Sequence, residues 1–245
     1  MKNNTSVICA VYSKDPDRFA LLEKHYQNLK QQTVDVQPIY IFEDGDCPPE
    51  SINGDFIIFN KPLTIYEAWN LGLSACRTPL AMNLNLDDRL HNDAIELLER
   101  EIFNSGADLI GGDWKICFSQ SEVDDTRVCY PSESIPFLPG WPPSKGFLTR
   151  LGSGTGERGT YGPATMWKVE AHIGFPRYPY RTTDDYRIQG VSDSIWWNIL
   201  KNQLNKKIVR VPTIIGNYHS HPDSQAEFRY GGEWEMLKDK IISPY

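Results

Sequence analysis

Carboxylate side chains follow an apolar run in the first half of the chain. The run from Pro79 to Leu84 is succeeded directly by Asn85-Leu86-Asp87-Asp88. Carboxylate oxygens are hard ligands that suit Mg²⁺ or Mn²⁺, and an ion held here could bridge the two phosphates of a diphosphate. A purely structural interpretation is also open, in which Asp88 shapes the turn and Asn92 caps the helix that follows.

Three other polar groups come directly after apolar runs. They are Tyr12-Ser13, Glu43-Asp44-Gly45 and Tyr218-His219-Ser220-His221. In doubly wound α/β sheets, ligands bind beyond the carboxyl ends of the strands, so these positions are candidates for a binding site. A carboxylate of Glu43 or Asp44 could accept hydrogen bonds from the base or ribose of a nucleotide. The pair Asp44-Gly45 is equally a common turn.

The two histidines near the end of the chain are candidate metal ligands. His219 and His221 are two positions apart, so in an extended segment they face the same side. Neutral imidazole is a good ligand for transition metals, and mixed oxygen and nitrogen ligation suits Mn²⁺ better than Mg²⁺. One of the two histidines is open to a plainer interpretation as a surface residue.

The elements that must position these groups alternate between strands and helices, which indicates a doubly wound α/β fold with a mostly parallel sheet. Strands are predicted from the apolar runs Val7 to Tyr12, Pro38 to Phe42, Phe56 to Phe59, Pro79 to Leu84, Asp108 to Gly112 and Ile208 to Ile215. Helices are predicted after Asp15-Pro16, with Phe19, Leu22, Tyr26 and Leu29 on one face, and then from the capping box at Thr64 to about Ala75, from about Asn92 to Phe103 and from about Asp193 to Leu204.

The segment from Pro131 to Pro163 is rich in proline and glycine and predicts a long loop region. Loops of that length in a compact domain are usually functional, and a lid that closes over substrate fits here. Arg150 or Arg158 could clamp a phosphate. The glycines are not followed by the Gly-Lys-Ser/Thr ending of a phosphate-binding loop, which gives little support to nucleoside triphosphate hydrolysis.

Composition excludes several classes of partner. The 245 residues carry a formal charge of −7 without a basic run, so nucleic acid and anionic membrane are not expected as partners. The five cysteines are scattered and include no C-x-x-C pair, which favours a reducing cytoplasm over a disulfide framework. No signal peptide or membrane-spanning run is expected.

Taken in order, the first motifs resemble those of the family 2 glycosyltransferases, which have the GT-A fold of the nucleotide-diphospho-sugar transferase superfamily. Val7 to Ser13 (VICAVYS) resembles the opening strand and its proline-x-tyrosine-asparagine loop, with Ala10 and Ser13 at the proline and asparagine positions. Tyr40 to Asp46 (YIFEDGD) is similar to the strand ending in Asp-Asp-Gly, which holds the nucleoside. Asn70-Leu71-Gly72-Leu73 resembles the Asn-x-Gly helix.

The later motifs continue the resemblance, which covers about residues 6 to 224. Asn85 to Ala94 is similar to the Asp-x-Asp-Asp stretch, and Asp87 aligns with its metal ligand. Gly162 to Trp167 resembles the segment that borders the acceptor site. Ser192 to Trp197 is similar to the Glu-Asp-x-x-x-Trp motif, whose aspartate is the catalytic base. Tyr218 to Ser224 resembles the Tyr-x-x-His-x-x-Ser terminus, whose histidine can join the metal and diphosphate site.

The resemblance implies a single GT-A domain over residues 1–245. Residues 1–114 would form the nucleotide-binding half, 115–230 the acceptor and catalytic half, and 231–245 a C-terminal helix or tail. The implied donor is a nucleotide-diphosphate sugar, most simply a UDP-sugar, and the acceptor is a glycan, lipid or small molecule that the sequence does not specify. The implied cofactor is Mn²⁺ or Mg²⁺, and the transfer would invert the anomeric carbon.

Roles follow residue by residue from the same resemblance. Asp193 would be the catalytic base, with Asp184 and Asp185 as rivals, and Asp87 and His221 would hold the metal. Nucleotide contacts are expected from Ala10, Val11, Tyr12, Glu43, Asp44, Asn70, Asn85, Leu86 and Asp87. Acceptor or lid contacts are expected from Gly162, Trp167, Trp196 and Arg158. Trp196 and Trp197 cannot both face the core of a regular helix, so we expect one of them to be exposed beside the sugar.

Two alternatives stay open. Asn85 and Ser192 stand where the family has acidic residues, which is compatible with a weakened relative that binds nucleotide and metal without turnover. A nucleotidyltransferase shares the alternating fold and the metal requirement, but it would be expected to carry a basic, glycine-rich first loop. Val7 to Asp17 contains no glycine.

Overall fold

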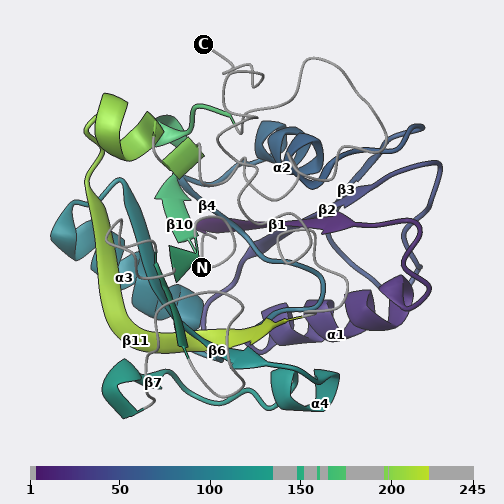
Figure 1. The fold of residues 1–245 in the computed structure, drawn as a ribbon. Coiled ribbons are helices and arrows are strands. Elements are labelled where there is room, and N and C mark those ends of the chain that lie inside the picture. The colour runs from purple at the N-terminus through teal and green to yellow at the C-terminus, as the bar shows by residue number, and fades with distance from the viewer. Residues whose placement is uncertain are drawn as a thin grey trace, which may run out of the picture.

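The computed structural model describes residues 4–134, 148–151, 159–160, 165–174, 196–197 and 199–220. One sheet runs through the described part of the molecule, in the order β3-β2-β1-β4-β10-β6-β11-β5 (Figure 1). These strands are β1 (Thr5–Val11), β2 (Gln37–Phe42), β3 (Asp55–Ile58), β4 (Leu80–Asn83), β5 (Arg89–Leu90), β6 (Leu109–Cys117), β10 (Thr165–Lys168) and β11 (Ile208–His219). Off this path, β7 (Tyr130–Pro131) pairs with β11, β8 (Leu148–Leu151) pairs with β6, and β9 (Gly159–Thr160) pairs with β8.

The sheet is mostly parallel, as predicted. Strands β3, β2, β1 and β4 are parallel neighbours, and β6 is parallel to β11. The exceptions among these neighbours are β10, which lies antiparallel between β4 and β6, and β5, which is antiparallel to β11. Strands from both predicted halves, 1–114 and 115–230, therefore join one sheet.

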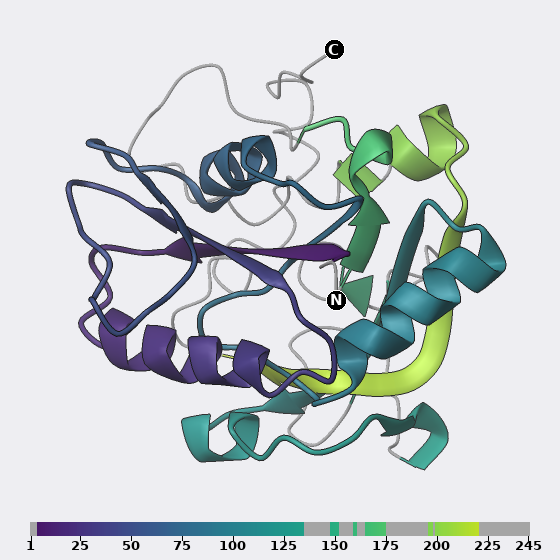
Figure 2. The same ribbon diagram turned by 180° about the vertical axis from the view of Figure 1, so that it is seen from behind.

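Helices cover both faces of the sheet. The described helices are α1 (Arg18–Lys30), α2 (Ile65–Ser74), α3 (Ala94–Ser105) and α4 (Gln120–Val123), with short turns η1 (Ser132–Ser134), η2 (Val169–Ala171) and the π-helical η3 (Ile199–Gln203). Figures 1 and 2 show α1 and α3 on one side of the sheet and α2 on the other. In β1, Val7, Cys9 and Val11 pack in the clusters that contain α1 and α3 residues, while Ile8 packs in the cluster that contains α2 residues. Burial on both faces explains why the strands are continuous apolar runs.

The start of α2 follows the predicted capping box. The Thr64 hydroxyl accepts a hydrogen bond from the Glu67 backbone N–H, and the Glu67 carboxylate accepts one from the Thr64 N–H. The other two predicted starts need correction. Helix α1 begins at Arg18, because Asp15 closes a preceding turn by accepting the Asp17 N–H at 2.9 Å. Helix α3 begins at Ala94 after Asp93, so Asn92 is not its cap.

Three further predictions about elements need correction. Phe19 of α1 is 37 % exposed, and the buried face of that helix carries polar side chains beside its leucines: Leu22, His25, Asn28 and Leu29. The segment Pro131 to Pro163 is not wholly loop, because β8 and β9 lie within it; residues 135–147, 152–158 and 161–164 are outside the described part. Of the helix predicted from about Asp193 to Leu204, the structure describes Trp196 and Trp197, which are helical, and η3, which is a π-helix.

Strand β11 extends four residues beyond its predicted end at Ile215, to His219. Gly216 permits this extension because β5 crosses very close to it. A Cβ atom at Gly216 would lie 2.4 Å from the Arg89 carbonyl oxygen, a distance at which something must move. The absence of a side chain thus lets β11 run beside β5 and carry His219 to the end of the sheet.

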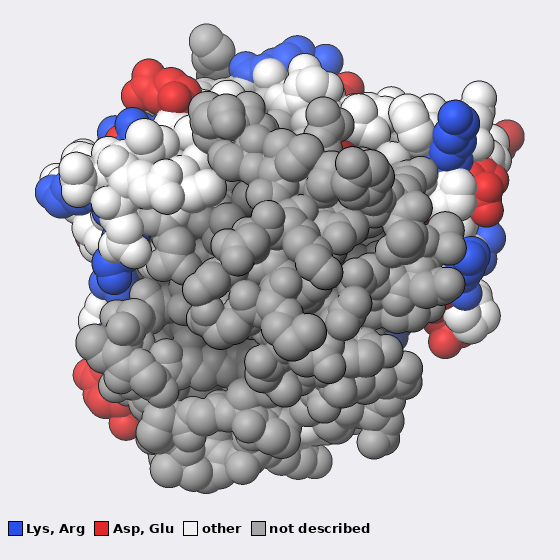
Figure 3. Space-filling model, turned by 45° about the horizontal axis from the view of Figure 1, so that its top comes forward, with Lys and Arg blue, Asp and Glu red and all other residues white. Residues whose placement is uncertain are grey.

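On the face shown in Figure 3, the described residues carry acidic and basic side chains in small mixed groups. No helix among the described residues has both the length and the apolar character needed to cross a lipid bilayer.

Candidate functional site

The polar groups identified in the sequence meet at the carboxyl ends of neighbouring strands. Because β1 pairs in parallel with both β2 and β4, the residues after these three strands lie at the same edge of the sheet. A direct contact confirms this for two of them, since Ser13 after β1 hydrogen-bonds to Glu43 after β2. The end of β11 reaches the loop after β4 through His219.

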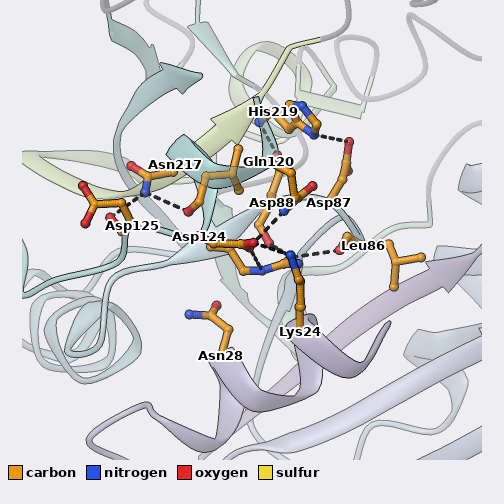
Figure 4. A network of polar contacts seen from close by, with 12 residues as sticks. Lys24, Asn28, Leu86, Asp87, Asp88, Gln120, Asp124, Asp125, Asn217 and His219 are labelled. Atoms are coloured by element: carbon orange, nitrogen blue, oxygen red, sulfur yellow. Dashed lines mark hydrogen bonds and ion pairs between the residues drawn. The ribbon is translucent and has the colours of Figure 1, made fainter. Parts of the chain in front are cut away.

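The loop after β4 is closed by a turn in which the Asp88 N–H donates to the Asn85 carbonyl at 3.2 Å. The Asp88 side chain is fully buried. Its Oδ1 accepts the His219 backbone N–H at 2.8 Å, and its Oδ2 accepts the Asn85 side-chain amide at 3.1 Å. Figure 4 shows the carboxylate of Asp88 directed into this network. Asp88 therefore joins the acidic loop to the end of β11.

The Asp87 carboxylate and the His219 imidazole point toward one another (Figure 4), with 3.7 Å between Asp87 Oδ2 and His219 Nδ1. Their side chains are 27 % and 11 % exposed, so both border the surface. His221, the metal ligand expected from the sequence motif, lies outside the described residues. In the structure, His219 is the histidine that faces Asp87. The sequence could not distinguish His219 from His221, because residues two apart in a strand face the same side.

Electrostatics at the acidic loop are dominated by burial. The pKa of Asp88 is raised well above its ordinary value, first by burial and then by the neighbouring charge of Asp87. Hydrogen bonds from His219 and Asn85 and the charge of Arg89 act in the opposite direction. Asp88 is thus an internal acceptor, while Asp87 is the more exposed of the two carboxylates.

Glu43 has a different position from the one expected of a nucleoside contact. It is 4 % exposed. Its Oε1 accepts the Ser13 N–H at 3.2 Å and the Ser13 hydroxyl at 3.3 Å, and its Oε2 accepts the Leu63 N–H. Glu43 thereby braces the loop after β1 against the segment that leads into α2. The next residue, Asp44, is exposed and left-handed, with φ of 54°, and leads into Gly45 at 79°. Of these two acidic residues, Asp44 is therefore the one whose side chain is exposed at this edge of the sheet.

The other expected nucleotide contacts differ in what they can present. Tyr12 is 55 % exposed, immediately after β1, and Asn70 is partly buried on α2. Ala10 is also partly exposed. Val11 and Leu86 are buried among apolar side chains, so neither presents its side chain at this edge of the sheet.

The tryptophans form part of the core, which corrects the expectation that one of Trp196 and Trp197 is exposed. Trp167 and Trp196 are both fully buried and meet edge to face, with ring centroids 5.3 Å apart, and Trp197 is 2 % exposed. His172 stacks on Trp167 at 5.7 Å. The departure from a regular α-helix at η3 accompanies this double burial. A sugar acceptor could not stack on either Trp167 or Trp196 without first uncovering it.

Several predicted site residues lie outside the described part of the chain. They are Asp193 with its rivals Asp184 and Asp185, His221, Gly162 and Arg158. Arg150 lies on β8, whose backbone alone is described.

The fold is an α/β architecture with a mostly parallel sheet, in which acidic residues follow strands β2 and β4. A search of family models gives no match, and no curated protein sequence matches. Solved structures do match. TarS 1–349 from S. aureus in complex with UDP superimposes with a TM-score of 0.60 at 12 % identity, covering 89 % of this chain and 61 % of that one. The same fragment in complex with UDP-GlcNAc gives 0.58 at 11 % identity, with coverages of 93 % and 61 %.

A mannosyltransferase shares the fold as well. The mannosyltransferase PcManGT from Pyrobaculum calidifontis, in complex with GDP-Man and Mn²⁺, gives a TM-score of 0.54 at 11 % identity, covering 94 % of this chain and 60 % of that one. The present chain thus spans about three fifths of these structures. At such low identity the likeness establishes the GT-A-like fold that the sequence motifs predicted.

Proposed function

We propose that this protein is a metal-dependent glycosyltransferase that moves a sugar from a nucleotide-diphosphate sugar, most simply a UDP-sugar, to an acceptor hydroxyl. The observation that carries the proposal is the pairing of Asp87 with His219 at the carboxyl edge of a GT-A-like sheet. UDP, UDP-GlcNAc and GDP-Man are bound by the proteins that share the fold. This supports a nucleotide-sugar as the class of donor.

The residues at this edge fit a divalent ion. A carboxylate and an imidazole 3.7 Å apart form a mixed donor set that suits Mn²⁺ better than Mg²⁺. No cluster of three or more acidic, histidine or cysteine side chains suited to a metal occurs in the described ranges, so oxygens of the diphosphate and of water would complete the coordination. His221 stays a candidate for a further ligand. When bound, the ion would stabilise the charge that builds on the departing diphosphate.

The nucleoside would lie across the ends of β1 and β2. Tyr12 offers an exposed ring, and Asp44 offers a carboxylate that could accept hydrogen bonds from the base or ribose. Asn70 would contribute from α2. Glu43 acts here by bracing the two loops that carry Tyr12 and the start of α2.

In the proposed reaction, the acceptor oxygen attacks the anomeric carbon while the bond to the diphosphate oxygen breaks. The acceptor proton passes to the Asp193 carboxylate, which acts as general base. A single displacement of this kind inverts the anomeric carbon. Gly162 and Arg158 are assigned to the acceptor side or a lid, and the buried pair Trp167 and Trp196 to the core behind it.

The test is calorimetric titration of the purified protein with UDP and with GDP, with and without Mn²⁺. We expect UDP binding that requires Mn²⁺, loss of that binding in Asp87→Ala and His219→Ala, and its retention in Asp193→Asn. Asp193→Asn should instead abolish sugar transfer and donor hydrolysis. Absence of metal-dependent binding of either nucleotide to the wild-type protein would overturn the proposal.

A second candidate is a GT-A-like protein that binds nucleotide and metal without turnover. The observation in its favour is that Asn85, at a position where the resemblance expects an aspartate, directs its amide to Asp88 rather than presenting a carboxylate. Metal-dependent UDP binding with no hydrolysis of UDP-GlcNAc, UDP-glucose or GDP-Man would favour this candidate over the transferase.

A further inference from the structure

Arg89 is a buried cation directly after the acidic loop. Its side chain is 2 % exposed, and it is among the largest fully buried side chains of the described residues. A buried guanidinium is unfavourable unless charges and hydrogen-bond acceptors compensate it. The contacts of Arg89 therefore indicate what its burial achieves.

The guanidinium holds the backbone on both sides of Asp87. Its Nη1 donates to the Leu86 carbonyl at 2.9 Å and to the Asp88 carbonyl at 2.7 Å. We propose that Arg89 is a positioning residue, which fixes the carbonyl groups of the two residues on either side of Asp87, Leu86 and Asp88, and thereby directs the Asp87 carboxylate toward the metal and diphosphate. This inference rests on the function proposed above.

Arg89 is itself anchored from the far side. Its Nε lies 3.2 Å from Asp124 Oδ1, at the C-terminal cap of α4. The Asp124 carboxylate also accepts hydrogen bonds from Gln120 Nε2 at 2.9 Å and from Lys24 Nζ of α1 at 2.7 Å (Figure 4). The guanidinium is thus held between a carboxylate fixed by two helices and two carbonyls of the acidic loop.

The geometry requires arginine rather than any cation. Arginine presents several donors in a rigid plane, so it can reach the two carbonyls and Asp124 together. A lysine at this position would keep the charge but offer a single compact ammonium on a flexible stem. Arg89→Lys therefore separates the positioning role from the presence of a positive charge.

The matched control is Arg210→Lys. Arg210 likewise pairs with a carboxylate, that of the fully buried Asp113. Its Nε donates to Asp113 Oδ1 at 2.7 Å, and its Nη2 donates to Asp113 Oδ2. It lies on β11 well before the strand reaches His219. Both variants keep the positive charge and lose the planar set of guanidinium donors, but only Arg89→Lys acts on the acidic loop.

The experiment titrates Mn²⁺ into each protein at a fixed UDP concentration, well below the melting temperature of every variant. We expect Arg89→Lys to weaken the apparent Mn²⁺ affinity about 10-fold to 100-fold, as changes around metal ligands commonly do, and Arg210→Lys to leave it unchanged. Without ligand, hydrogen exchange of the amides in residues 85–90 should accelerate in Arg89→Lys and not in Arg210→Lys.

The outcomes separate this inference from the function on which it rests. If the wild-type protein binds UDP with Mn²⁺ and Arg89→Lys retains wild-type Mn²⁺ affinity, or if Arg210→Lys loses as much, the positioning role is wrong. If Arg89→Lys does not fold, Asp124→Asn removes the charged anchor while keeping Arg89, and unchanged Mn²⁺ affinity and exchange in that variant also overturn the role. Absence of Mn²⁺-dependent UDP binding in the wild-type protein overturns the proposed function, and with it this inference.

Discussion

Asp88 Oδ1 accepts the backbone N–H of His219 at 2.8 Å, joining residues that are 131 positions apart in the chain. The bond fixes the end of β11 to the loop after β4. It also brings the His219 imidazole to the neighbouring Asp87 carboxylate. One buried acceptor thus sets the position of both candidate metal ligands.

Replacement of this acceptor should destabilise the protein. Asp88→Ala leaves the His219 N–H and the Asn85 amide without their acceptor, and we expect the free energy of unfolding to fall by about 1–3 kcal/mol. Asp87→Ala is the control, because it relieves repulsion with Asp88 and should leave stability equal or higher while abolishing metal binding. Urea denaturation measures both. Equal destabilisation by the two variants would contradict the separate roles.

Glu43 and Asp44 should differ in the same way. Both carboxylate oxygens of Glu43 accept hydrogen bonds, from Ser13 and from Leu63. In Glu43→Gln one of these oxygens becomes an NH₂ group, which cannot accept, so we expect the unfolding free energy to fall by about 1–3 kcal/mol. Asp44→Asn retains a residue that tolerates positive φ and should leave stability unchanged. UDP affinity measured by calorimetry should fall in Asp44→Asn. An unfolding free energy of Glu43→Gln equal to that of the wild-type protein would refute the bracing role of Glu43.

The buried histidines predict a stability that falls in mild acid. Burial lowers the pKa of His25 to about 3 and the pKa of His172 to about 4. Burial also lowers the pKa of His91 to about 4, and the charge of Arg127 adds to this effect. Below the unfolded value of about 6.5 the unfolded chain takes up protons that the folded chain does not, so stability is full above that pH and declines toward pH 4. We expect about 1 kcal/mol of loss per pH unit for each histidine.

The measurement is urea denaturation between pH 7.5 and pH 4.5, with His25→Gln as the comparison. Removal of one titrating group should reduce the slope of stability against pH in that variant. A flat profile for the wild-type protein across this range would show that these histidines are not held neutral.

Replacement of Asn83 by leucine should stabilise the protein. It is fully buried at the end of β4, and neither polar atom of its amide has a hydrogen-bond partner among the described residues. Asn83→Leu should raise the unfolding free energy by about 1 kcal/mol, because it removes an unsatisfied buried amide at similar volume.

Asn28→Leu is the contrasting variant. Asn28 donates to the Leu90 carbonyl at 2.8 Å and accepts the Leu90 N–H at 2.9 Å, so its loss leaves two backbone groups unpaired. Thermal denaturation should show opposite shifts for the two variants. A lower melting temperature for Asn83→Leu would mean that its amide is satisfied in solution.

The fold class and the shared sheet edge of the candidate residues were predictable because they depend on local pattern and on one rule of sheet topology. Strands covered on both faces are continuous apolar runs, and parallel strands place their carboxyl ends at one edge. The acidic residues after β2 and β4 could therefore be assigned to the same edge of the sheet from their positions alone, with β1 between the two strands. The start of α2 was predicted correctly since a capping box involves only residues three apart.

Tertiary structure alone decided which of these residues face one another. His219 and His221 are equivalent by the alternation of a strand, and only the bond to Asp88 selects His219 as the partner of Asp87. Glu43 is turned inward by the backbone N–H groups of Ser13 and Leu63. Trp196 and Trp197 are both buried because the core surrounds these two adjacent positions. Such contacts join residues far apart in the chain, and their free energy depends on packing that local sequence does not encode.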